Sequence, residues 1–68
     1  MMEAIRDYKG GLACMGERET GLIDYQYKGC KIKTTLAVGS SISLERGKIC
    51  TIITRDSASS FDVDSFAA

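Results

Sequence analysis

The residue types that most often carry catalysis are sparse in this chain of 68 residues, which contains no histidine. That absence excludes Ser-His-Asp and Cys-His catalysis, histidine general bases and zinc sites that use imidazole. The serines around Ser40 and Ser57 therefore lack a base, and we expect them to be turn residues. We predict that the protein is not an enzyme.

Three cysteines, Cys14, Cys30 and Cys50, are the remaining candidate nucleophiles. A reactive thiolate needs nearby cations that lower its pKa, and Cys30 stands between Lys28 and Lys31. The alternation of its strand nevertheless points Cys30 toward the core, so we expect it to be buried. The three cysteines show no CxxC spacing and lack a fourth zinc ligand. We predict no metal and no cofactor.

Two acidic residues near the end of the chain, Asp62 and Asp64, lie on one face of the same expected strand and could share a hard cation. Their surroundings lack the spacing and the glycine of a calcium loop. We therefore expect them to be solvated or to protect a strand edge. The glycines at Gly10, Gly11 and Gly16 do not form a phosphate-binding motif.

Charge is distributed unevenly along the chain, although it sums to zero. Residues 26–55 contain six basic side chains and a single acidic one, Glu45, whereas both ends of the chain are acidic. Such a basic region can bind phosphate, nucleic acid or an acidic protein. Alternatively, it keeps the turns soluble and is neutralised by the chain ends. We expect four of these cations to meet at one rim of the fold: Lys28, Lys31, Arg46 and Lys48.

The elements that must position these groups are strands, because from Thr20 onward apolar and polar side chains alternate with a period of two. A two-residue turn at Lys28-Gly29 brings apolar side chains opposite one another and sets acid opposite base, as stable cross-strand pairs do. This arrangement buries both tyrosines in the core. The predicted pairs are Tyr27 with Cys30, Tyr25 with Ile32, Ile23 with Thr34, Gln26 with Lys31, and Asp24 with Lys33.

Two further turns continue the sheet. A three-residue loop at Gly39-Ser40-Ser41 is predicted to pair Val38 with Ile42 and Leu36 with Leu44. A two-residue turn at Arg46-Gly47 is predicted to pair Glu45 with Lys48 and Leu44 with Ile49. The result is a four-stranded antiparallel meander over residues 20–55.

The predicted fold class is mainly β, a small antiparallel meander of four to five strands that forms a curled sheet or small barrel, as one domain over residues 1–68. Residues 1–19 form an N-terminal segment with a short helix over residues 2–9 or an irregular structure. Residues 56–68 form a loop, followed either by an edge strand over residues 60–66 or by a frayed tail.

One face of this meander is apolar and cannot stay in water. Three covers are available: closure into a barrel by the last strand or residues 12–15, the N-terminal segment, or a second copy. We expect a curled sheet that is completed or reinforced as a homodimer. The predicted function is a non-enzymatic interaction module that acts through protein–protein binding or self-association. The alternative is anion or nucleic-acid binding through the basic rim.

The cellular compartment is suggested by the cysteines and by the absence of targeting patterns. Three is an odd number for a disulfide framework. The first 14 residues carry charges and no apolar stretch typical of a secretory signal, and no apolar run approaches the ~20 residues that span a membrane. We expect a protein of the reducing cytoplasm without membrane association.

Overall fold

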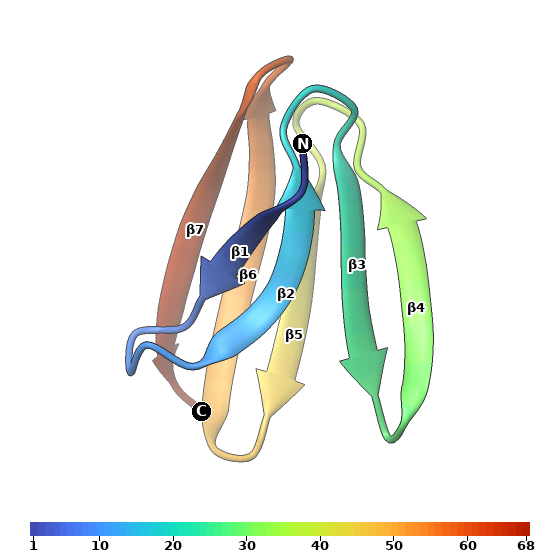
Figure 1. Ribbon diagram of the computed structural model, residues 1–68. Coiled ribbons are helices and arrows are strands. Elements are labelled where there is room, and N and C mark those ends of the chain that lie inside the picture. Colours follow the sequence, from blue (N-terminus) through green and yellow to red (C-terminus); the bar gives the residue numbers. More distant parts are fainter.

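The computed structural model describes all 68 residues and consists of seven strands, with no helix. They form two antiparallel sheets in the orders β1-β2-β3-β4 and β5-β6-β7, which lie face to face (Figure 1). The mainly β, antiparallel class is confirmed, although the sheets do not close into a barrel. The chain has no helical segment capable of crossing a membrane. The strands are β1 (Glu3–Arg6), β2 (Leu12–Glu17), β3 (Leu22–Tyr27), β4 (Cys30–Thr35), β5 (Ser41–Arg46), β6 (Ile49–Ser57) and β7 (Ser60–Ala67).

The predicted N-terminal helix is wrong, because this segment forms β1 and pairs with β2. A helix of two turns is marginal by itself, whereas the strand buries Ile5 opposite Cys14. Asp7 closes the hairpin, since its Oδ1 accepts hydrogen bonds from the backbone N–H groups of Lys9 and Gly11, each at 2.9 Å. This local side-chain bonding is typical of aspartate in turns.

The hairpin of β3 and β4 has the predicted register at all five predicted pairs. Lys28 and Gly29 form its turn with φ angles of 51° and 81°. Positive φ at both central residues is the geometry of a type I′ turn, which matches the twist of the flanking strands. The pairing of apolar with apolar and acid with base is therefore compatible with the backbone of the turn.

The predicted pairing of β4 with β5 is wrong, because the chain changes sheets between them. The N–H of Leu36 donates to the carbonyl of Gly21 in the β2–β3 turn at 2.8 Å, whereas the N–H of Gly39 donates to the carbonyl of Arg55 in β6 at 2.6 Å. Val38, which was expected to face Ile42, is 56% exposed at this crossover. Leaving the first sheet here allows two apolar faces to pack against each other.

The turn between β5 and β6 is Gly47-Lys48, one residue later than predicted. Gly47 has a φ of 62°, and glycine at the first central position is typical of a type II′ turn. The predicted pairing of Glu45 with Lys48 is therefore wrong. Each side chain of β5 and β6 still points to the predicted face of the sheet, because the new turn shifts each pairing partner by two residues. The observed pairs include Leu44 with Thr51, Glu45 with Cys50, and Arg46 with Ile49.

The predicted C-terminal edge strand is present as β7, which pairs with β6 along its length. Together with β5 it makes the second sheet, whose apolar face covers the apolar face of the first. The cover for that face is thus a sheet of the same chain. The buried core lies between the sheets and consists of Ile5, Cys14, Ile23, Leu36 and Ile53, with Tyr25, Ile42, Leu44 and Phe61 packed against it.

The Arg55 side chain joins the two sheets at one end through hydrogen bonds. Its Nη1 donates to the carbonyl of Leu36 at 3.0 Å, and its Nη2 donates to those of Glu19 at 3.3 Å and Ala58 at 3.1 Å. These carbonyls belong to the β2–β3 turn, the β4–β5 crossover and the β6–β7 turn. Gly21 must lack a side chain here, because its φ is +81° and a Cβ would lie 2.3 Å from the Leu36 oxygen.

We predict that Arg55→Met lowers the free energy of unfolding by about 2–3 kcal/mol, since three carbonyls lose a charged donor. Urea unfolding measures this change. The matched control is Arg18→Met, which removes only an exposed ion pair with Glu3 and should cost less than about 1 kcal/mol. Equal losses in the two variants would contradict the role given to Arg55.

Candidate functional site

The molecule opens at the end opposite Arg55. The strands β2 and β3 are paired only over Met15–Glu17 and Leu22–Asp24, whereas β3 stays paired with β4 as far as Tyr27. The lower parts of β2 and β3 therefore diverge (Figure 1). Because β4 and β5 are also unpaired, a cleft is left between the β3–β4 hairpin and β5.

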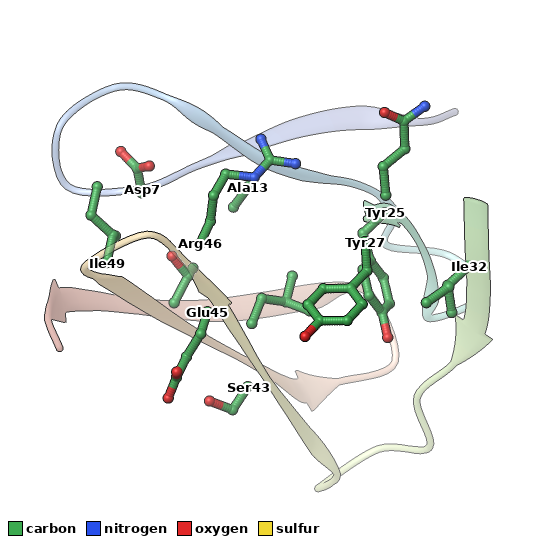
Figure 2. A pocket seen from close by; sticks show the side chains of 12 residues that line it. Asp7, Ala13, Tyr25, Tyr27, Ile32, Ser43, Glu45, Arg46 and Ile49 are labelled. Carbon is green, nitrogen blue, oxygen red and sulfur yellow. The ribbon is translucent and has the colours of Figure 1, made fainter. Parts of the chain in front are cut away.

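This cleft has a volume of about 380 Å3. Figure 2 shows Tyr25, Tyr27 and Ile32 of the hairpin opposite the segment of β5 that contains Ser43 and Glu45. Its size and its mixture of apolar and polar groups are typical of small ligand pockets. The lining residues are Asp7, Ala13, Tyr25, Gln26, Tyr27, Ile32, Ser43, Leu44, Glu45, Arg46, Ile49 and Thr51.

The two tyrosines differ in burial, although both were predicted to lie in the core. Tyr25 packs against the core and also forms part of the cleft wall. Tyr27 is 53% exposed, because no strand of the second sheet covers the tip of its hairpin. The ammonium of Lys28 lies 5.4 Å from the centre of the Tyr27 ring, a cation–π distance. Tyr27 is therefore available to a ligand.

The four cations of the predicted basic rim lie in or next to two turns and differ in the hollows that they line. The β3–β4 and β5–β6 turns lie at the same end of the molecule (Figure 1). Lys31 and Arg46 line a second hollow of about 300 Å3, where β2 and β3 diverge, and Arg46 also donates to the carbonyl of Leu12 at 3.0 Å. Lys28 lies beside the first cleft at Tyr27, whereas Lys48 lines neither hollow.

None of these four cations takes part in an ion pair. The ion pairs of the structure join the Met1 amino group to Glu17 at 3.1 Å and to Glu19 at 3.5 Å, and Arg18 to Glu3 at 2.7 Å. The cations at the open end are thus available to an external anion. The lining of the first cleft also contains two carboxylates, those of Asp7 and Glu45, so its charge is mixed.

Two cleft residues come from a segment that the sequence did not connect with a site. Asp7 and Ala13 belong to the β1–β2 hairpin, which was expected to be helical or irregular. The available signal was the Asp-Tyr-Lys-Gly-Gly run at residues 7–11, since aspartate followed by glycine is typical of turns. That signal predicts a hairpin, but it does not predict that the hairpin borders a cleft.

The cysteines occupy three different environments. Cys14 is 3% exposed; burial and, secondarily, the Asp24 carboxylate raise the pKa of its thiol to about 11. Cys50 is buried with its Sγ 3.4 Å from the Ser43 hydroxyl. Cys30 is exposed at the hairpin tip, so the prediction that it is buried is wrong. No three His, Cys, Asp or Glu side chains gather as a metal-binding group.

The cleft offers groups that contact and orient a ligand. Tyrosine rings and aliphatic side chains form its walls, and Arg46 and two carboxylates provide charge. No known protein family, curated protein or solved structure matches this chain.

We predict that iodoacetamide at pH 8 alkylates only Cys30 in the native protein. Cys14 and Cys50 are buried, and the raised pKa of Cys14 keeps it as an unreactive thiol. Mass spectrometry should show one adduct in buffer and three in denaturant. A Cys30→Ser control should gain none in buffer; rapid native modification of Cys14 would contradict the structure.

Proposed function

We propose that this protein is a non-enzymatic binding module that takes an extended segment of a protein partner along the cleft between the β3–β4 hairpin and β5. The observation that carries the proposal is that two strands with free edges, β4 and β5, both contribute to the cleft lining. A free edge can hydrogen-bond to an added strand, while adjacent pockets accept every second side chain of that strand.

The chemistry of the lining supports an extended peptide. Tyr25, Ile32 and Leu44 present apolar surface from three different strands, which suits the apolar side chains on one face of a peptide. Its other face would remain in water, as on the outer strand of a sheet. Arg46 at the rim can bond to a carboxylate or a backbone carbonyl. We also propose the cytoplasm as the compartment of the protein, because three cysteines are an odd number for a disulfide framework.

The proposal is tested with octapeptides selected from a displayed library for binding to the intact chain. A bound peptide is expected to shift the backbone amide NMR signals of β4 and β5. Leu44→Glu should weaken binding at least tenfold, because it places a carboxylate in an apolar wall. Tyr27→Ser should also weaken binding, and it tests the cleft without altering the core.

The matched control is Val38→Glu, an exposed position outside the cleft lining. It should bind like the unmodified protein. The proposal would be overturned if no selected peptide shifted the signals of β4 or β5. It would also be overturned if the Leu44→Glu and Tyr27→Ser variants bound a selected peptide as tightly as the unmodified protein does.

Anion or single-stranded nucleic-acid binding is the second candidate function. It is favoured by one observation: the exposed Tyr27 ring lies beside Lys28, near Arg46, and both cations lack ion-pair partners. Aromatic rings stack on bases and cations follow the phosphates in proteins that bind single strands. The zero net charge weighs against nonspecific coating of nucleic acid, so this candidate ranks second.

An oligothymidine column at low salt tests this candidate. We expect the combined change Lys28→Glu and Arg46→Glu to abolish retention, and Tyr27→Ala to weaken it by about 1–3 kcal/mol, the typical contribution of one base–aromatic stack. The control Lys9→Glu with Arg18→Glu alters net charge by the same amount at two residues that do not line the cleft. Retention that is indifferent to salt and to the Lys28/Arg46 change would exclude nucleic-acid binding.

A further inference from the structure

The two sheets end in outer strands of opposite charge. The outer face of β4 carries Lys31 and Lys33, and the outer face of β7 carries Asp62 and Asp64, all of them exposed. None of the four takes part in an ion pair. Both strands have a free edge.

These charges discriminate between the ways in which two copies can meet. Charged side chains on edge strands generally oppose edge-to-edge pairing. Pairing β4 with β4 sets lysines beside lysines, and pairing β7 with β7 sets aspartates beside aspartates, which destabilises both arrangements. Pairing β4 of one copy with β7 of another brings lysines beside aspartates. Of these three pairings, only that of β4 with β7 brings opposite charges together.

One register satisfies the charged and the apolar residues together. Placing Ile32 beside Val63 sets Lys31 beside Asp62 and Lys33 beside Asp64. Val63 is 41% exposed, and Ile32 lines the open cleft. The contact therefore removes apolar surface from water on one face while it forms two ion pairs on the other.

The arrangement of the strands permits this contact. In Figure 1, β4 and β7 lie at opposite sides of the molecule, in different layers, and point in opposite directions. Turning a second copy over, about an axis across the strands, brings its β7 alongside β4. The two strands are then parallel, and their charged faces lie on the same side. The added β7 lies at the mouth of the cleft beside Ile32.

We propose that the extended segment bound at this cleft is β7 of a second copy, added to the free edge of β4. This inference rests on the proposed strand-binding function and specifies the partner. The interface is head-to-tail, because different surfaces meet. Each pair consequently keeps a free β4 at one end and a free β7 at the other, so association continues beyond the dimer.

Sedimentation velocity of the intact chain from micromolar to millimolar concentration tests the proposal. The average mass should rise with concentration past that of a dimer. Lys31→Glu with Lys33→Glu makes both edges acidic, and Asp62→Lys with Asp64→Lys makes both edges basic. Each variant alone should stay monomeric, while their equimolar mixture should associate again.

The control is Lys9→Glu with Arg18→Glu, which changes the net charge as much as the Lys31/Lys33 variant does but leaves β4 and β7 intact. It should associate like the unmodified chain. A chain that stays monomeric throughout, variants that still associate alone, or a mixture that does not associate would each overturn the β4–β7 contact. Selected peptides that bind β4 and β5 of a monomeric chain would refute the second copy as partner and leave the proposed function standing.

Discussion

The hydrogen bonds of the Arg55 guanidinium join the two sheets at one end of the molecule. The guanidinium donates to carbonyls of the β2–β3 turn, the β4–β5 crossover and the β6–β7 turn, so one side chain joins three connections that are distant in sequence. Its Nε is buried without a partner, a cost that the three charged hydrogen bonds offset. The rigid fork of donors makes arginine suited to this position.

Closing one end of the molecule leaves the other end open. Nine of the 68 residues are buried, and a chain of this length buries only about 60% of the surface that its unfolded form exposes. The core of Ile5, Cys14, Ile23, Leu36 and Ile53 accordingly lies between the sheets, while Tyr27 at the tip of its hairpin remains accessible. The same shortage of core that limits stability therefore leaves apolar surface for a partner to cover. This asymmetry, rather than any reactive group, is the physical basis of the proposed binding role.

The charges on the free edge strands β4 and β7 bear on which segments could add to them. An unprotected edge strand pairs with almost any extended chain, but β4 carries Lys31 and Lys33, and β7 carries Asp62 and Asp64. Like-charged edges repel, whereas edges of opposite charge attract. If strands add to β4 as proposed, these charges favour acidic or neutral segments there, which connects the proposed function with the proposed partner.

The sequence by itself determined the features that depend on neighbouring residues. The register of β3 with β4 follows from side-chain alternation on either side of the Lys28-Gly29 turn, because these two strands are adjacent in the sequence. For β5 and β6 the sequence determined which residues share a face but not which pairs face each other, since a shift of two residues preserves the faces. The tertiary structure alone decided that the chain changes sheets after Leu36, that the segment around Ile5 becomes a strand, and that Tyr27 is exposed. These outcomes depend on contacts between distant segments, such as Arg55 with Glu19 and Leu36. A local pattern of residues does not show which distant segments will come into contact.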